Sequence, residues 1–284
     1  MSVNWWCSAQ KGPWSWTLQY YPGIWAAMIG LLIAYVYAIK RIGPNRVGPD
    51  EPVVTQKQVT AFGAGYVLLW VATDWPIGAL GAGYLLTAHM IQYILYSLVV
   101  APLLIRGMPP WMRELILEAP GVGWARYLVQ RPLGAFIFFN AVLALTHMPF
   151  IADTLKPIQF GSMLMDVIWL IAALIFWASM AGMGSLRGDE APETASGSGA
   201  KRVLYVIGIT FLPTIPGAFF VFSEFPVYTT FEFTTRAIGD FSAKDDQVLA
   251  GLLMWVGTMP ILMARLGMAF FHWSQAESRR AGQI

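Results

Sequence analysis

Few residues able to bind a metal ion occur within the apolar stretches of this chain. His89 lies in one stretch, His147 and Met148 close another, and Asp166 stands near the start of a third. Imidazole and thioether groups are ligands that select soft cations such as copper(I). His89, His147 and Met148 are therefore candidate ligands of a copper site.

A hydrogen-bonded network is the alternative interpretation of the same region. Three polar side chains follow His89 at intervals of three, four and seven residues, namely Gln92, Tyr93 and Tyr96. This spacing places all four side chains on one face of a helix. Polar groups within a membrane normally face other helices or a cavity. Gln92, Tyr93 and Asp166 are then expected to form an interhelical polar cluster with His89. The Asp166 carboxylate must remain hydrated, find a donor such as Tyr93, or be protonated.

Seven apolar stretches must position these residues, and each is near the length of about 20 residues that a helix needs to cross a bilayer. Hydrophobic residues make up 57% of the 284 residues and charged residues only 12%, unlike the composition of a soluble domain. We predict an all-α fold in which residues 1–284 form a single polytopic membrane domain. The predicted spans are roughly 18–39, 59–75, 82–105, 133–150, 164–183, 203–223 and 248–271.

Basic residues are distributed unequally between the loops. The loops of one side, with the C-terminal segment from Arg265, contain 14 Lys and Arg residues, whereas the N-terminus and the remaining loops contain only Lys11, Lys156, Arg236 and Lys244. The positive-inside rule places the side rich in basic residues in the cytoplasm. The N-terminus is thus expected outside and the C-terminus inside, and Lys156 and Lys244 are expected to be accessible from outside.

Three segments outside the spans have distinctive compositions. Residues 1–17 contain four Trp and are typical of an aromatic segment at the outer membrane interface. Residues 188–200 are small and acidic, which indicates a flexible cytoplasmic loop. Residues 224–247 form the longest outer loop, rich in Phe and Thr, and are expected to dock on a partner or to hold short structure.

Several classes of function are disfavoured. The sequence contains no paired general acid and base, no nucleophile with an adjacent base, and no paired histidines at a spacing that would bind haem, so we expect no enzyme activity. It contains no internal repeat of the kind found in many transporters. The charge distribution indicates contact with membrane lipid and no nucleic-acid partner.

A short basic loop suggests one respiratory relative. Residues 41–49, RIGPNRVGP, resemble the short basic loop of a quinone-binding membrane component of respiratory complex I. That family handles quinone and protons with acidic residues, whereas no acidic cluster appears on the cytoplasmic side of the later spans of this chain. A charged anchor at the headgroup level is the simpler interpretation of the loop.

A second resemblance extends over about residues 60–260. The run LGAGYLLTAHMIQ, which ends at Gln92, and VVAPLL, which ends at Leu104, resemble the third span of the CtaG-like cytochrome c oxidase assembly proteins. Further pieces recur in the same order as in that family: Arg131-Pro132, Phe139-Asn140-Ala141, Thr146-His147-Met148-Pro149, Leu174-Ile175-Phe176-Trp177, Asp246-Gln247 and AGLLMW from Ala250 to Trp255.

The resemblance implies a role with a haem–copper terminal oxidase, or its supercomplex, in a bacterial inner membrane. His89 and His147 match histidines of the family, but Tyr93, Ser162 and Asp166 stand where the family has further histidines. Tyr, Ser and Asp are poor partners for copper(I). The first hypothesis is therefore an oxidase-associated accessory subunit or assembly partner. The alternatives are an active copper-delivery factor and a quinone- or proton-handling respiratory subunit.

Overall fold

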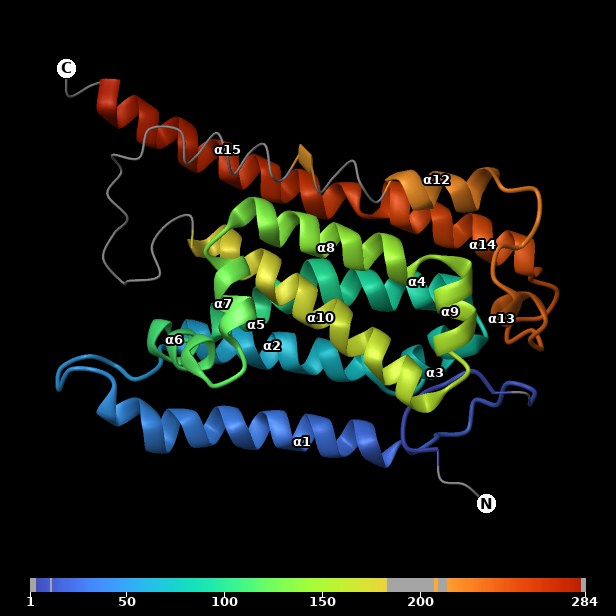
Figure 1. Ribbon diagram of the computed structural model, residues 1–284, viewed down its shortest axis with the longest axis horizontal. Coiled ribbons are helices and arrows are strands. Elements are labelled where there is room, and N and C mark those ends of the chain that lie inside the picture. Colours follow the sequence, from blue (N-terminus) through green and yellow to red (C-terminus); the bar gives the residue numbers. More distant parts are fainter. Residues whose placement is uncertain (1–3, 11, 183–206, 209–213, 282–284) are drawn as a thin grey trace.

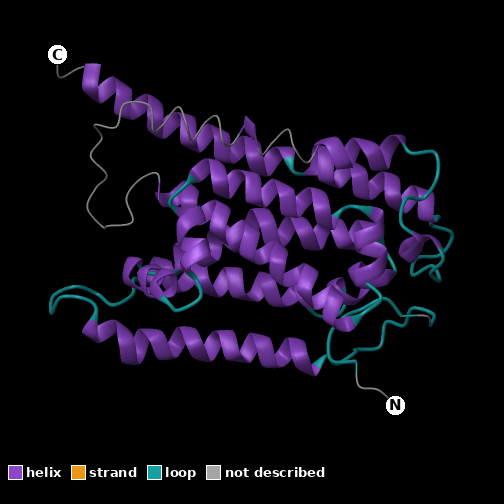
Figure 2. Ribbon diagram, viewed as in Figure 1, coloured by secondary structure: helices purple, strands orange, loops and turns teal. Residues whose placement is uncertain are grey.

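The fold consists of helices packed side by side along a common direction, as the computed structural model shows (Figures 1 and 2). The structure describes residues 4–10, 12–182, 207–208 and 214–281, and this part of the chain contains no strand. The predicted all-α class is confirmed for these residues. The predicted loop 188–200 lies outside the described residues, as do residues 203–206 and 209–213 of the predicted span 203–223.

The helices of the described chain differ widely in length. Their bounds are α1 Pro22–Tyr37, α2 Gln56–Thr73, α3 Ile77–Gly83, α4 Leu86–Ile94, α5 Ala101–Gly107, α6 Pro110–Glu118, α7 Gly123–Val129, α8 Pro132–Thr146, α9 Pro149–Leu155, α10 Gln159–Gly182, α12 Thr214–Phe222, α13 Thr229–Glu232, α14 Ala243–Leu252 and α15 Met259–Ala281. The remaining turns are the π-helical segments η1 Ala38–Ile42, η3 Leu95–Val100 and η4 Leu253–Gly257, and the 3₁₀ turn η2 Gly43–Asn45.

Prolines set the starts of several helices. Pro22, Pro110, Pro132 and Pro149 are the first residues of α1, α6, α8 and α9. Proline suits this position because its backbone angle is already helical and the first turn needs no N–H from it. These prolines therefore mark where α1, α6, α8 and α9 begin.

Four helices of the described chain are long and apolar enough to cross a membrane: Pro22–Asn45, Leu86–Gly107, Gln159–Ala181 and Ala243–Ala264. A fifth candidate is the pair α7 and α8, which is bent by 111°. The chain is thus a multi-pass membrane protein with four or five candidate spans. The seven spans and the orientation of the termini stay predictions.

Helix α10 lies in the middle of the bundle, where it packs against α5, η3, α8 and α9 (Figure 1). Its Phe176 ring contacts Phe139 of α8, with the ring centroids 5.2 Å apart. Helix α1 lies along one edge and packs on α2, where Tyr35 stacks on Phe62. Helix α10 thus joins α8 to η3, the segment that continues α4. The start of α4 carries His89, and His147 follows the end of α8.

Candidate functional site

The two histidines meet at one end of the bundle. His89 lies in the first turn of α4 and His147 follows α8, and their ring centroids are 6.2 Å apart. Both side chains are buried. The structure therefore brings together two candidate ligands that are far apart in the sequence.

Each imidazole is oriented by a backbone carbonyl. Nδ1 of His89 lies 3.1 Å from the Gly81 carbonyl oxygen, and Nδ1 of His147 lies 2.8 Å from the Leu143 oxygen. Because a carbonyl only accepts, each Nδ1 must donate, which leaves the lone pair on Nε2. Neither Nε2 atom has a hydrogen-bond partner among the described residues. Metal-binding histidines are commonly oriented in this way.

Gly81 permits the close approach of α3 to α4 that this arrangement needs. A Cβ atom at Gly81 would lie 3.0 Å from the backbone nitrogen of His89 and 3.1 Å from Oε1 of Gln92. A larger residue would push α3 away and lengthen the bond between the Gly81 carbonyl and His89.

The Trp169 ring of α10 packs against both imidazoles. Its ring centroid lies 5.0 Å from that of His89 and 5.8 Å from that of His147. The indole N–H donates to Oγ1 of Thr146 at 2.8 Å, which fixes the ring. Tyr93 packs edge-on against His147 at 4.8 Å. Trp169 was not among the residues selected from the sequence, although it follows Asp166 at the helical spacing of three residues.

Lys156 and Asp166 form a buried ion pair near the Trp169 ring. Their Nζ and Oδ1 atoms are 3.6 Å apart, and the side chains are only 1% and 4% exposed. The Lys156 Nζ also lies 3.5 Å from Oγ of Ser162 and 5.3 Å from the centroid of the Trp169 ring. The ammonium therefore shares Trp169 with the two imidazoles.

The predicted accessibility of Lys156 is wrong. Its side chain is buried because α9 turns the chain back toward α10 and the N-terminal segment covers it, with the Ala9 N–H donating to the Lys156 carbonyl at 3.0 Å. Of the alternatives for Asp166, the structure provides a donor, but this donor is not Tyr93. Asp166 accepts instead from Nε1 of Trp6 at 2.9 Å and pairs with Lys156.

Gln92, another residue of the predicted polar cluster, bonds to Tyr96 rather than to Asp166. Nε2 of Gln92 donates to the Tyr96 hydroxyl at 3.2 Å, and that hydroxyl lies 2.7 Å from Oγ1 of Thr73 on α2. Gln92, Tyr93 and Tyr96 are all buried, as their shared stripe predicts. Gln92 thus links α4 to α2 through Tyr96, while Asp166 belongs to the ion pair.

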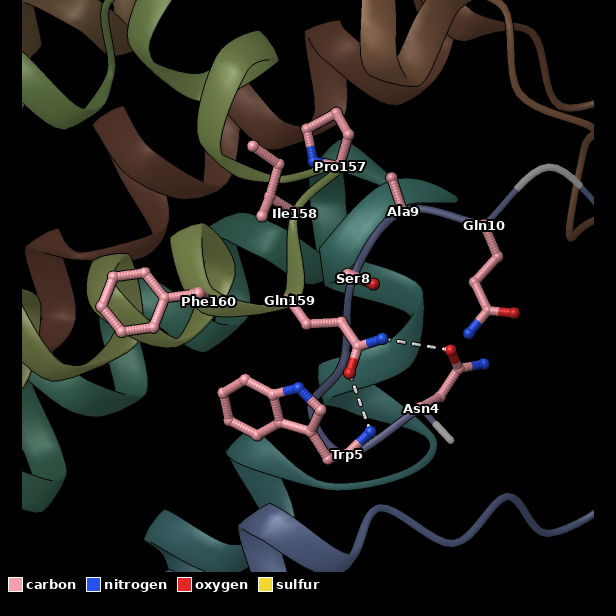
Figure 3. Close-up of a pocket in the computed structure, with 9 residues that line it drawn as sticks. All are labelled: Asn4, Trp5, Ser8, Ala9, Gln10, Pro157, Ile158, Gln159 and Phe160. Carbon is pink, nitrogen blue, oxygen red and sulfur yellow. Dashed lines mark hydrogen bonds between the residues drawn. The ribbon is translucent and has the colours of Figure 1, made fainter. Parts of the chain in front are cut away.

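Residues 4–10 run across the start of α10 (Figure 3). Oε1 of Gln159 accepts from the Trp5 backbone N–H at 2.8 Å, and its Nε2 donates to Oδ1 of Asn4 at 3.3 Å. A pocket of about 600 Å³ lies between this segment and residues 157–160. Trp6 itself points inward to Asp166, so the N-terminal segment contributes directly to the buried ion pair.

Asp246 of α14 accepts hydrogen bonds from the first N–H groups of α4. Its carboxylate accepts from the backbone N–H groups of Leu86 at 2.6 Å and Thr87 at 2.9 Å, and the Thr87 hydroxyl donates to the Asp246 carbonyl. Helix α4 lacks a side-chain cap of its own because Leu85 occupies that position. Asp246 therefore caps the helix that carries His89. Two features of the sequence pointed to it: the Asp246-Gln247 motif of the family resemblance and the missing local cap at Leu85.

Tyr228 of the loop 224–247 binds the backbone of His147. Its hydroxyl donates to the His147 carbonyl at 2.7 Å. Burial raises the pKa of Tyr228 well above its usual range, so the hydroxyl stays protonated and remains a donor. The loop 224–247 is thus attached to the turn that carries His147.

The residues present do not fit a tight copper site. Met148 is 49% exposed, so its side chain does not share the buried environment of the two imidazoles. No group of three or more His, Cys, Asp and Glu that could hold a metal ion occurs within the described part of the chain. An ammonium group, Lys156, also contacts the ring on which both imidazoles pack. Two imidazoles beside a resident cation make a poor site for another cation.

Comparison with known proteins identifies the family. No curated protein and no solved structure gives a significant match. A family model does match, over residues 33–276, and it describes the cytochrome c oxidase caa3 assembly factors. This range contains both histidines, the Lys156–Asp166 pair and Asp246. The chain belongs to the Caa3_CtaG family of cytochrome c oxidase caa3 assembly factors.

Proposed function

We propose that this protein acts as an accessory subunit or stable assembly partner of a haem–copper terminal oxidase in a bacterial inner membrane, and that it has no enzyme activity of its own. The observation that carries the proposal is the Lys156 ammonium beside His89 and His147. A fixed positive charge disfavours copper at this position. Membership of the oxidase assembly family then supports a role that depends on contact with the oxidase.

Loop 224–247 supplies a contact surface for this role. The Asp153 carboxylate accepts from the backbone N–H groups of Thr229 and Thr230, at 3.0 and 2.9 Å. Oε1 of Gln247 accepts from the Val227 N–H at 2.6 Å. The loop backbone is thus held in place while Phe233 is 80% exposed. Ordered backbone with exposed aromatic side chains suits a protein interface, where aromatic residues are enriched.

Co-purification from the native membrane tests the proposal. The tagged protein, isolated in mild detergent, should bring oxidase subunits with it at fixed stoichiometry. A Phe233→Ser variant should recover less oxidase at unchanged expression, whereas Phe150→Ser, which removes an exposed ring from α9, should recover as much as wild type. Tagged protein that carries copper and no oxidase would contradict the accessory role.

Copper delivery is the second candidate. The observation that favours it is that Nε2 of His89 and Nε2 of His147 have no hydrogen-bond partner within the described ranges. Delivery would require an additional ligand, which the exposed Met148 or the acceptor protein would have to supply. Oxidase that lacks its copper centre when His89→Ala and His147→Ala variants replace the wild type, yet still co-purifies with them, would support this candidate.

A further inference from the structure

The bend between α7 and α8 is set by a proline. Pro132 is the first residue of α8, and the residue before a proline is disfavoured in the helical conformation. Arg131 accordingly adopts φ −124° and ψ 88°, which interrupts the helical backbone between the two helices. Helix α7 meets α8 at 111° and lies crosswise at one end of the bundle (Figure 1). It therefore leaves the direction along which the candidate spans run.

Helix α7 has two different faces. Ala125 and Val129 are buried and pack in a cluster with Ile175 of α10. Trp124 and Tyr127 lie outside that cluster, and each is 52% exposed. Exposed Trp and Tyr side chains are common at the headgroup level of a membrane, because each combines an apolar ring with a polar group. One face thus attaches α7 to the bundle, and the other presents two aromatic rings.

Two arginines accompany these rings. Arg126 and Arg131 are exposed. The Arg131 guanidinium lies over the Tyr127 ring, 3.8 Å from its centroid, and donates to the Tyr127 hydroxyl. Neither arginine forms an ion pair with a carboxylate of the described residues. Guanidinium groups bind phosphate through charge-assisted hydrogen bonds, so these two charges are complementary to anionic headgroups.

We propose that α7 lies flat in the membrane interface and binds anionic phospholipids. Its two exposed aromatic rings lie at the headgroup level, and the guanidinium groups of Arg126 and Arg131 bind the phosphates. Helix α8 packs along α10, a candidate span, so a helix at 111° to α8 runs close to the membrane plane. The pair α7 and α8 is then not one bent span, and the chain enters the apolar core at Pro132. This inference concerns the purified chain in lipid and holds whether or not the chain accompanies an oxidase.

The depth of α7 in a bilayer tests the first part of this proposal. The full chain is spin-labelled at Trp124→Cys or Tyr127→Cys in a Cys7→Ser background, and is placed in nanodiscs of phosphatidylcholine and phosphatidylglycerol. Collision rates with oxygen and with an uncharged nickel chelate report the depth of each label. Both labels should lie at the headgroup level. If loss of either ring unfolds the chain, a label at Arg126→Cys should report the same depth.

Two control labels define the limits of this scale. Ile33→Cys is exposed on α1, within the candidate span Pro22–Asn45, and should lie in the apolar core. Phe233→Cys is exposed on the loop 224–247 and should lie in water. Labels on α7 as deep as Ile33→Cys would show a bent span. Labels as accessible to the chelate as Phe233→Cys would show that α7 lies in water, and either result overturns the proposal.

The choice of lipid tests the second part. Phosphatidylglycerol, compared with phosphatidylcholine alone, should lower the chelate accessibility of the Trp124→Cys label at least about twofold, because anionic headgroups attract the two arginines. The Arg126→Gln/Arg131→Gln variant should lose this difference. Arg46→Gln/Lys57→Gln is the matched control, because it removes the same charge at exposed positions outside α7, and it should keep the difference. An equal effect in Arg126→Gln/Arg131→Gln, or no effect in the chain with all its arginines, overturns the proposal.

Discussion

The indole N–H of Trp6 donates to the carboxylate of Asp166 at 2.9 Å, across 160 residues of sequence. This bond joins the N-terminal segment to α10 at the buried ion pair. Asp166 needs it because a buried carboxylate without donors is strongly disfavoured. The N-terminal segment therefore completes the polar centre of the bundle.

Trp6→Phe should lower the stability of the protein while keeping most of the packing. Loss of a hydrogen bond to a charged group costs about 1.5–3 kcal/mol. Thermal unfolding in detergent, followed by size-exclusion chromatography, measures the change. Trp16→Phe is the control, since that ring is exposed. Equal melting temperatures for the two variants would show that the Trp6 bond does not stabilise the fold.

Asp246→Ala should destabilise the start of α4 and disturb His89. The change leaves the N–H groups of Leu86 and Thr87 without their acceptor. Loss of a helix N-cap costs about 1 kcal/mol, and loss of a buried charged acceptor costs more. Asp245→Ala is the matched control, because this neighbouring carboxylate is exposed and bonds within its own turn. Hydrogen exchange of residues 86–90 should rise in the first variant only, and an unchanged rate would contradict the capping role.

Cys7 should react slowly with maleimide in the folded protein. Burial, with Asp166 and Asp74 nearby, raises the pKa of the Cys7 thiol well above its usual range. Little thiolate therefore exists at about pH 8, and thiolate is the reactive form. Denatured protein should react rapidly at the same pH.

The same shift has a consequence for stability. The folded state disfavours the Cys7 thiolate, so wild-type stability should fall as the pH rises through the unfolded thiol pKa toward the raised one. Below that window the thiol is protonated in both states and the effect is absent. Cys7→Ser should lack this loss between about pH 8 and about pH 10. If the stability of wild type and of Cys7→Ser depended on pH in the same way, the buried Cys7 thiol would not have this effect.

The orientation can be tested by cysteine labelling of intact spheroplasts in a Cys7→Ser background. Phe233→Cys lies at an exposed position of loop 224–247 and should be labelled from outside. Arg46→Cys is exposed on the side rich in basic residues and should be labelled only after lysis. Lys156→Cys should resist labelling even from outside, because that position is buried. External labelling of Arg46→Cys would reverse the orientation.

The sequence determined the features of this protein that depend on local composition. Runs of apolar residues require helices, because a backbone in lipid must satisfy its own hydrogen bonds. The spacing of His89, Gln92, Tyr93 and Tyr96 predicted one buried helical stripe, and the structure buries all four. The ordered motifs between residues 60 and 260 also predicted the family that the matching range 33–276 confirms.

Only the tertiary structure decided how the polar groups pair. Helical periodicity states which side chains share a face of one helix, and it carries no information on which distant segment covers that face. Lys156 is one of four basic residues on the side poor in positive charge, yet α9 and the N-terminal segment bury it against Asp166. Asp246 caps a helix 160 residues away for the same reason. Such pairs form because a buried charge or an uncapped helix end needs a partner, and the packing of the whole bundle selects it.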